Sequence, residues 1–428
     1  MFREPKRFSR YAFAALMLSF SFGAMAQQQA KLPKLNPFLP PPVAANANIG
    51  AANVTANPGA NTHSSGSQLQ TFNYTVTATR DGNTYSGTMV GRSPFDNPFG
   101  FTKVSTRMVP IIVVTNSVFA GTTSAGAIIT APGVTTFDPT IADPSCLTAP
   151  NDVPLTLMKQ SPIFQPAAFN FGGTNVGFTQ TTDAFERANF FEPLNFGPGP
   201  SDTNITYHVI LSPVRTVSAI MINVPAASGV AYPSSVFGGC PAGMNAIIDF
   251  AFYQSALKAA LTGLVSQGVN PSMLPMFFLH NIVECEGTNC GALAPNTACC
   301  ILGFHSAVGP QTFASVDFDT SEIFVSPVPD VSVASHEVGE WMDDPFGNNP
   351  TPAWGHVGQV SGCQSNLEVG DPLSGTLAPP IFNPANGFTY HMQELAFFSW
   401  FYGAPSIGIH GWFSDNATFL QDAGPVCH

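Results

Sequence analysis

Residues 334–345 read ASHEVGEWMDDP, a stretch that places His336 and Glu340 four positions apart. On an α-helix that spacing puts both side chains on one face, one turn apart. A neutral imidazole and a carboxylate stacked in this way can bind the same divalent metal ion. Asp343-Asp344-Pro345 follows, and proline cannot continue a helix. The stretch therefore predicts a short helix that carries two metal ligands.

Glu337 directly follows the first predicted ligand, at the position where the HExxH helix of zinc peptidases carries its general base. In this chain Glu340 replaces the second histidine of that motif, which gives HExxE. We therefore predict that Glu337 is the catalytic base of a hydrolase and accepts the proton of the attacking water. The competing interpretation is an ordinary surface helix with one histidine and two solvated glutamates.

A catalytic zinc site usually has three protein ligands and one open position, so a third ligand is needed. The sequence leaves four candidates, which are Asp344, His356, Glu368 and Asp371. We predict Glu368 as the ligand and Asp371 as its partner. Asp344 continues the helical face but lies where the helix must end, which favours a role in orienting the ligands or in terminating the helix. His356 would give a His/Glu/His set.

The ligand set bears on the identity of the metal. A His/Glu/Glu set with Zn²⁺ is formally neutral, so it would acidify bound water less than a His/His/Glu set and could accept Mn²⁺. We predict zinc, with Mn²⁺ or Ca²⁺ as alternatives, and a Ca²⁺ site would use Asp343, Asp344 and Asp371. Tyr390 and His391 are candidate donors to the oxyanion of the reaction, although the same residues also fit a strand followed by a packed helix.

The N-terminus has the three parts of a secretory signal peptide. Four basic residues within positions 1–10 precede an apolar run at residues 11–22, and Ala24-Met25-Ala26 fits the cleavage site. We expect cleavage after residue 26 and a secreted or periplasmic protein, with an uncleaved anchor as the alternative. Residues 27–68 are rich in Pro, Ala, Asn and Gly without periodicity, which predicts a disordered leader that could be a propeptide.

The composition excludes some classes of partner. The chain has 14 Lys and Arg against 26 Asp and Glu, a net charge of −12 at pH 7. Nucleic-acid binding needs a basic surface, so we expect no nucleic-acid partner. No segment after the signal peptide has about 18 uninterrupted apolar residues, so we expect no membrane span there. The composition leaves the oligomeric state open.

All eight cysteines follow the predicted signal peptide. An even number of cysteines in an exported chain favours disulfides, although it does not fix their connectivity. We expect a local bridge between Cys285 and Cys290 and a second bridge between Cys363 and Cys427. A zinc knuckle formed by the cysteines within residues 285–300 is the alternative.

The first half of the chain favours β-structure. Residues 71–79 alternate in polarity, Asp81-Gly82-Asn83 supplies a turn, and residues 84–90 return in the same style, which predicts a hairpin. Further predicted elements are strands at residues 111–114, 207–211 and 217–224 and a short helix at residues 185–191.

The second half is patterned differently. Residues 245–267 have helical periodicity, and apolar runs that predict strands follow before the HExxE helix, for which Asp330 is the predicted N-cap. This order is the one expected of a zincin catalytic core. The predicted strands cover residues 276–283, 301–308 and 312–318. We therefore predict an α+β fold with a signal peptide (1–26), a disordered leader (27–68), a β-rich domain (69–236) and a zincin-like metal-binding domain (237–428).

Short motifs also suggest relatives. The chain combines an HExxE…DP helix at residues 336–345 with an E-V-G-D element at residues 368–371, and in both it resembles a group of secreted bacterial proteins of unassigned function. Residues 161–164 and 183–190 are similar to the same group. Gly303-Phe304-His305-Ser306 is similar to an element of the plant exordium, or phosphate-induced, family. The resemblance implies secretion, a zincin-like C-terminal half and an HExxE metal site.

Two functional hypotheses follow. The first is a secreted zinc metallopeptidase-like hydrolase that uses His336, Glu340 and Glu368 as ligands and Glu337 as the base, with a peptide or protein as substrate. The second is a non-catalytic secreted or surface protein in which the metal ion is structural.

Overall fold

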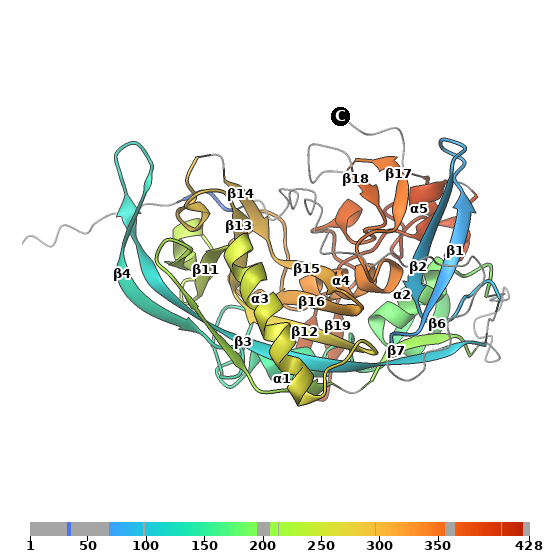
Figure 1. Cartoon of the computed structure of the whole chain (residues 1–428), viewed down its shortest axis with the longest axis horizontal. Coiled ribbons are helices and arrows are strands. Elements are labelled where there is room, and N and C mark those ends of the chain that lie inside the picture. The colour runs from blue at the N-terminus through green and yellow to red at the C-terminus, as the bar shows by residue number, and fades with distance from the viewer. Residues whose placement is uncertain are drawn as a thin grey trace, which may run out of the picture.

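The computed structural model describes residues 32–35, 68–96, 99–194, 206–212, 214–295, 297–355, 364–403 and 405–422. The described chain is α+β and rich in strands, as the sequence predicts (Figure 1). The predicted signal peptide, His356, Cys363 and Cys427 lie outside these ranges. No helix in the described ranges combines the length and the apolar character that crossing a membrane requires.

A sheet of twelve strands forms the centre of the described structure. Its main path runs in the order β14-β13-β11-β10-β3-β12-β16-β15, and four further strands pair with β3. The strands of the main path are β3 (Phe101–Thr122), β10 (Gly229–Pro233), β11 (Met244–Asp249), β12 (Met273–His280), β13 (Ile282–Glu286), β14 (Ala298–Ile301), β15 (Gly303–Val308) and β16 (Gln311–Phe318). The four others are β4 (Ile128–Phe137), β7 (His208–Leu211), β8 (Arg215–Thr216) and β9 (Ile220–Val224).

Strand β3 is a long strand that runs along the sheet and pairs with other strands at successive points (Figure 1). The sequence predicts a strand only at residues 111–114, but the strand extends in both directions. In its first half every second residue is buried, and these residues are Thr102, Val104, Thr106 and Met108. Strand β3 pairs with β10 and β12, which lie on either side of it in the sheet. Strands from both sides of the predicted domain boundary at residue 236 therefore belong to one sheet.

Residues 245–267, predicted as one helix, form three elements. Strand β11 occupies the start, helix α3 (Phe250–Leu264) follows, and a short 3-10 helix (Val265–Gln267) ends the range. The apolar run Ala246-Ile247-Ile248 is buried and pairs with β10 on one side and β13 on the other, which overrides its helical periodicity. The side chain of Asp249 then accepts a hydrogen bond from the Phe252 N–H at 2.7 Å and caps the new helix.

Several local predictions are confirmed. Strands β1 (Thr71–Thr77) and β2 (Thr84–Val90) form the predicted hairpin in unbroken register. The predicted helix at residues 185–191 overlaps α2 (Thr181–Asn189) at residues 185–189, and α2 begins four residues earlier and ends two residues earlier than predicted. The remaining regular elements are α1 (Pro154–Gln160), β5 (Ala167–Phe171), β6 (Thr174–Thr179), β17 (Pro350–Trp354), β18 (Gln364–Asn366), β19 (Ile381–Asn383), β20 (Phe388–Tyr390) and α5 (Phe398–Tyr402).

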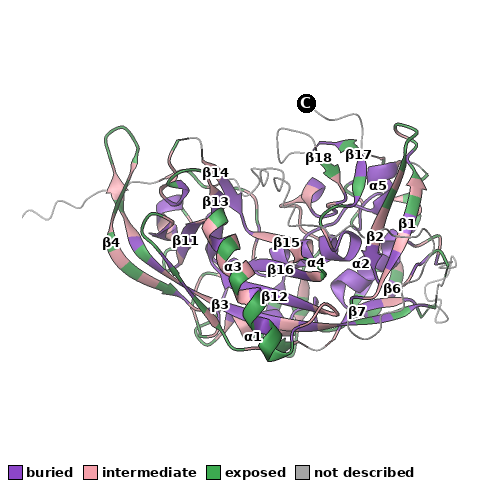
Figure 2. Cartoon of the chain, in the orientation of Figure 1, coloured by how far each residue is buried: buried purple, intermediate pink, exposed green. Residues whose placement is uncertain are grey.

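The HExxE stretch forms helix α4 (Ser332–Asp343), which packs against β15, β16 and α2. Every residue of α4 except His336 is buried (Figure 2). Position 339 requires glycine, because a Cβ at this position would lie 2.5 Å from the Leu395 side chain. The predicted N-cap was one residue early: Val331 is the N-cap, and Asp330 instead accepts the Val331 N–H at 2.6 Å in the turn before the helix.

Three disulfides join described cysteines. The predicted local bridge between Cys285 and Cys290 is present, and the others join Cys146 to Cys240 and the adjacent residues Cys299 and Cys300. The segment of the alternative zinc knuckle, residues 285–300, therefore has its four cysteines paired with one another. The predicted Cys363–Cys427 bridge lies outside the described residues.

Part of the predicted leader is in contact with the sheet-bearing region. Leu35 forms a parallel bridge with Phe324, and the Leu32 N–H donates to the Val236 carbonyl at 2.7 Å. Both leucines pack against a hydrophobic cluster that includes Phe324 and Phe237. Residues 32–35 are therefore ordered against the fold, which differs from the disorder predicted for residues 27–68.

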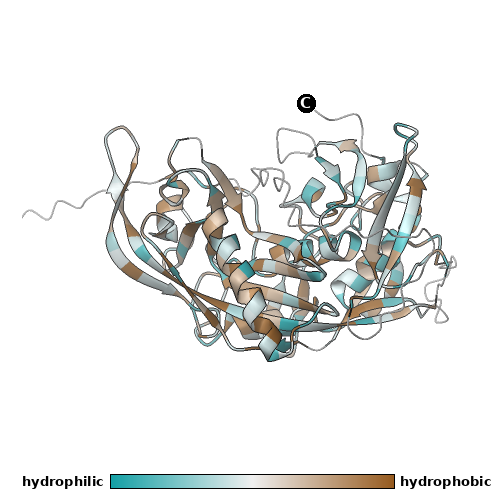
Figure 3. Cartoon of the chain, viewed as in Figure 1, coloured by the Kyte–Doolittle hydropathy of each residue, from teal (hydrophilic) through white to brown (hydrophobic). Residues whose placement is uncertain are grey.

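Hydrophobic residues concentrate on the central strands and on α3 (Figure 3). The largest described core cluster includes Trp341 from α4 and reaches Trp354 and Trp400 in the C-terminal part of the chain. Trp341 is fully buried, and its Nε1 donates to Thr312 Oγ1 at 3.0 Å. The helix that carries the HExxE motif is thus anchored by the same core that holds the sheet.

Replacing Trp341 by Ala should lower the free energy of unfolding by about 3–5 kcal/mol, because it removes a buried indole and leaves a cavity beneath α4. Chemical denaturation followed by circular dichroism measures this change. Val265→Ala is the control, since Val265 is 67% exposed and should change stability by less than about 0.5 kcal/mol. Equal losses in the two variants would contradict this account of the core.

Candidate metal centre

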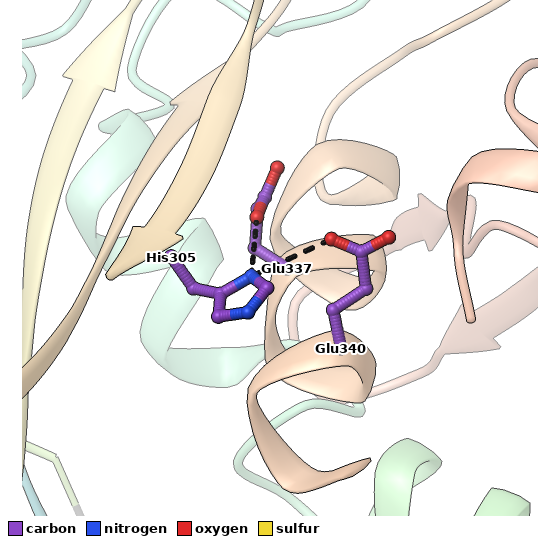
Figure 4. A group of neighbouring side chains, drawn as sticks. All are labelled: His305, Glu337 and Glu340. Atoms are coloured by element: carbon purple, nitrogen blue, oxygen red, sulfur yellow. Dashed lines mark ion pairs between the residues drawn. The ribbon is translucent and has the colours of Figure 1, made fainter. Parts of the chain in front are cut away.

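Three parts of the chain meet at the HExxE motif. Helix α4 supplies His336, Glu337 and Glu340, strand β15 supplies His305, and the segment after β18 supplies Asp371. Figure 4 shows the His305 imidazole reaching from its strand toward α4, with ion pairs to Glu337 and Glu340. Strand pairing between β15 and β16 and the packing of α4 on both strands bring these residues together.

The imidazole of His336 is held in one orientation. Its Nε2 lies 3.0 Å from Glu340 Oε1, as the spacing of one helical turn predicts. Its Nδ1 lies 3.0 Å from Gln393 Oε1, and the Gln393 amide nitrogen donates to the Gly370 carbonyl, which fixes Oε1 as an acceptor. Nδ1 therefore carries a proton, and Nε2 points at the carboxylates as a metal ligand would.

His305 is a site residue that the sequence reasoning did not select. Its Nε2 lies 2.9 Å from the Asp344 carbonyl and so donates a proton to it. Its Nδ1 lies 3.5 Å from Glu337 Oε2 and 3.5 Å from Glu340 Oε2. The Gly-Phe-His element at residues 303–305 was the only signal in the sequence, because His305 is distant from the motif along the chain.

Two groups of side chains in the described residues could hold a metal ion. The first consists of His336, Glu340 and Asp371, and the second of His305, Glu337 and Glu340. In each group the candidate ligand atoms lie within 4.8 Å of one another. Glu340 belongs to both groups.

Glu368, the predicted third ligand, belongs to neither group. Its Oε1 accepts a hydrogen bond from the Asn366 amide, and its Oε2 lies 3.8 Å from His305 Nε2. Asp371, the predicted partner, is closer to the motif: its Oδ1 lies 3.5 Å from His336 Nε2. The geometry therefore groups Asp371 with His336 and Glu340 as a candidate ligand, and Glu368 lies on the side of His305.

Asp344 ends the helix instead of extending the ligand face. Its two carboxylate oxygens accept the N–H groups of Asn348 and Asn349, at 2.9 and 2.8 Å. Its carbonyl oxygen accepts from His305 Nε2. Asp344 thus orients a candidate ligand through its backbone, while its side chain stabilises the turn that follows α4.

The predicted oxyanion donors are engaged elsewhere. The Tyr390 hydroxyl donates to the Leu157 carbonyl at 2.9 Å. The His391 Nδ1 lies 2.6 Å from Asp330 Oδ2, and this contact raises the pKa of His391 above its usual value. Both side chains support the segment around the helix start, and neither is in the two candidate metal groups. His356 lies outside the described residues.

Two glycines allow the backbone to approach these side chains. A Cβ on Gly370 would lie 2.5 Å from His336 Cγ, and a Cβ on Gly303 would lie 2.8 Å from Glu337 Oε1. Gly370 also donates its N–H to Glu340 Oε1 at 3.1 Å. The E-V-G-D element therefore positions the site through its glycine as well as through its carboxylates.

Burial and close charges shift the ionisation of both imidazoles. Burial by itself would lower the pKa of each histidine, but the neighbouring carboxylates outweigh it. They raise the pKa of His336, mainly through Glu340, and that of His305, mainly through Glu368 and Glu337, well above the usual value. In the metal-free protein the carboxylates therefore favour the charged form of both rings.

The pKa values of the carboxyl groups shift in opposite directions. Burial would raise the pKa of Glu340, but the two imidazoles outweigh it and hold that pKa below its usual range. Burial raises the pKa of Glu337, and it raises that of Glu368 well above the usual value. Oε2 of Glu337 and Oε2 of Glu368 are buried and accept no hydrogen bond, and the charged contact that each makes is with His305, at 3.5 and 3.8 Å. Buried carboxylate oxygens without a hydrogen bond fit a site that takes a cation.

Comparison of the chain with protein-family models, with curated proteins and with solved structures gave no match. The resemblance to secreted bacterial proteins and to the exordium family therefore stays a prediction from short motifs. The functional interpretation rests on the geometry of the metal centre.

Replacing Gly370 by Ala should weaken metal binding by about 10–100-fold, because the new methyl group displaces the His336 imidazole and the segment that carries Asp371. Isothermal titration with Zn²⁺ measures the affinity. Gly263→Ala in α3 is the control, since nothing lies within 4 Å of its Cβ position. Unchanged affinity in Gly370→Ala would contradict the proposed ligand position.

The metal-free protein should lose stability as the pH rises from about 6 to about 8. Native His305 and His336 keep protons that the unfolded chain releases near a pKa of about 6.5, so the native state binds more protons. This stabilisation is complete below about pH 6.5 and is lost as the pH rises through the native pKa values of the two histidines. Burial raises the pKa of Asp343 to about 7, so Asp343 also makes the folded protein less stable as the pH rises.

Thermal unfolding in a chelator at several pH values tests this dependence. The melting temperature should fall across the range. In His336→Gln the free energy of unfolding should fall less steeply with pH, by about 1.4 kcal/mol per pH unit, because one retained proton is removed. A melting temperature that rises with pH in the chelated protein would show that the imidazoles are neutral in the native state.

Proposed function

We propose that this chain is an exported, metal-dependent hydrolase of peptide bonds. In this proposal His336, Glu340 and Asp371 bind the metal ion, and Glu337 is the general base. The observation that carries it is the pairing of an oriented His336 Nε2 with two carboxylates, directly beside a buried glutamate. The same adjacency of ligand and base serves amide hydrolysis in zinc peptidases.

The donor set fits zinc, which binds imidazole nitrogen and carboxylate oxygen in tetrahedral sites. A bound Zn²⁺ would supply Lewis acidity and lower the pKa of water. Glu337 would then accept the proton of that water and return it to the leaving amine. Its burial raises its pKa, which brings the carboxyl group closer to the range useful for proton transfer near neutral pH.

The exposure of the site suggests the side from which a substrate would enter. The side chains of His336 and Asp371 are 12% and 13% exposed, whereas that of His305 is 4% exposed. A scissile carbonyl group would therefore approach along His336 and Asp371. The three disulfides and the predicted signal peptide support action outside the cytoplasm.

A structural metal site is the second candidate. It is favoured by the depth of the group formed by His305, Glu337 and Glu340, whose side chains are no more than 6% exposed. In a structural site all positions around the metal would be filled by the protein, and no water would be activated.

Glu337→Gln separates the two candidates. A catalyst should lose about 10²–10⁴-fold in kcat and keep the metal held by His336, Glu340 and Asp371, because the base is removed and those ligands remain. Cleavage of a mixed peptide library, followed by mass spectrometry, gives the rate, and elemental analysis gives the metal content. Glu192→Gln, at an exposed glutamate, is the matched control.

Two results would contradict the proposal. Full turnover in Glu337→Gln would exclude Glu337 as the base. A metal-loaded wild-type chain that cleaves no peptide in the library would favour the structural site.

A further inference from the structure

We propose that the centre binds two divalent metal ions bridged by Glu340. One ion is held by His336 Nε2, Glu340 Oε1 and Asp371 Oδ1. The other is held by His305 Nδ1, Glu340 Oε2 and Glu337 Oε2. This inference rests on the proposed function, since it adds a second ion to the same site.

The two oxygens of Glu340 face different histidines. Oε1 lies 3.0 Å from His336 Nε2, and Oε2 lies 3.5 Å from His305 Nδ1. Oε1 also accepts the N–H groups of Gly370 and Asp371, at 3.1 and 3.2 Å, which fixes the plane of the carboxylate. A carboxylate held in this way can bind one ion through each oxygen, and paired ions in hydrolases lie about 3.5–4 Å apart.

The spacing within each group suits a separate ion. A tetrahedral zinc ion with ligand bonds of about 2.0–2.2 Å separates its ligand atoms by about 3.3–3.6 Å. His305 Nδ1 lies 3.5 Å from Glu337 Oε2 and 3.5 Å from Glu340 Oε2. In the other group, His336 Nε2 lies 3.5 Å from Asp371 Oδ1. Its distance of 3.0 Å to Glu340 Oε1 is shorter than this range, so these two side chains would have to separate slightly around an ion.

Hydrogen bonds orient both imidazole rings in the same way. Each donates its remaining ring proton to a fixed oxygen, which is the Asp344 carbonyl for His305 and the Gln393 side chain for His336. Each therefore directs a lone pair toward Glu340 when it is neutral. A single ion held by one of these histidines would leave the lone pair of the other without a cation.

The acidic side chains also favour more than one ion. Three of them, those of Glu337, Glu340 and Asp371, belong to the two candidate groups. With neutral imidazoles, one divalent ion leaves one of these three negative charges without a cation in a buried site. Glu337 Oε2, on a side chain that is 6% exposed, has no hydrogen-bond donor and faces His305.

Glu337 can serve both ions. Its Oε2 faces His305, while its Oε1 lies 4.0 Å from His336 Nε2 on the side of the first group. Binding the second ion through Oε2 leaves Oε1 to accept a proton. The second ion is therefore compatible with Glu337 as the base.

Metal stoichiometry tests the proposal on the mature chain with its disulfides intact. The protein is loaded with Zn²⁺, dialysed and measured by elemental analysis, with circular dichroism as the check on folding. We expect two zinc ions per chain in the wild type and one in each of His305→Ala and His336→Ala. His280→Ala, at a buried histidine that contacts Thr320 and Asp143, is the matched control and should keep both ions.

The other outcomes separate this inference from the proposed function. One ion that is retained in His305→Ala and lost in His336→Ala overturns the second ion and leaves the proposed hydrolase intact. One ion that is lost in both variants overturns the bridged pair in favour of a single shared ion. No bound metal in the wild type overturns both proposals.

A second measurement avoids dependence on the variants. The wild-type protein is loaded with Mn²⁺ and examined by electron paramagnetic resonance. Two ions bridged by Glu340 should give an exchange-coupled spectrum at full loading. A spectrum of isolated Mn²⁺ at full loading would overturn the proposal even if His305→Ala failed to fold.

Discussion

The arrangement of three separate segments depends on the contacts of one buried carboxylate, that of Glu340. It contacts His336 on its own helix, His305 on β15, and the backbone N–H groups of residues 370 and 371. A buried carboxylate without partners costs several kcal/mol, so the helix, the strand and the loop must keep these contacts or bind a cation in their place. The same contacts bring together the side chains that could hold a metal ion.

The sheet determines where these segments meet. Strand β3 pairs with β12, β12 pairs with β16, and β16 pairs with β15, so the long central strand fixes the position of His305 through three successive pairings. Helix α4 then lies against β15 and β16, with Trp341 anchored to Thr312. Little space remains around this helix, and glycine stands at positions 339 and 370, where a Cβ would lie 2.5 Å from the side chains of Leu395 and His336.

The fold could be predicted from the sequence where the information is local. The hairpin at residues 71–90 follows from alternating polarity and an Asp-Gly turn, and the Cys285–Cys290 bridge follows from close spacing. The extent of β3 and the strand at residues 244–249 could not be predicted, because each is a strand only by virtue of its neighbours in the sheet. For the same reason the sheet crosses residue 236, where a change of pattern suggested a boundary.

The sequence by itself determined that His336 and Glu340 share a helical face with Glu337 beside them, because helix geometry converts spacing into direction. Only the tertiary structure decided that His305 joins them and that Asp371, not Glu368, lies beside His336. His305 arrives through strand pairing, and Asp371 through a backbone that can approach the imidazole because residue 370 is glycine. Local periodicity fixes the direction of a side chain from its own element, whereas packing across the whole molecule decides which side chains it meets.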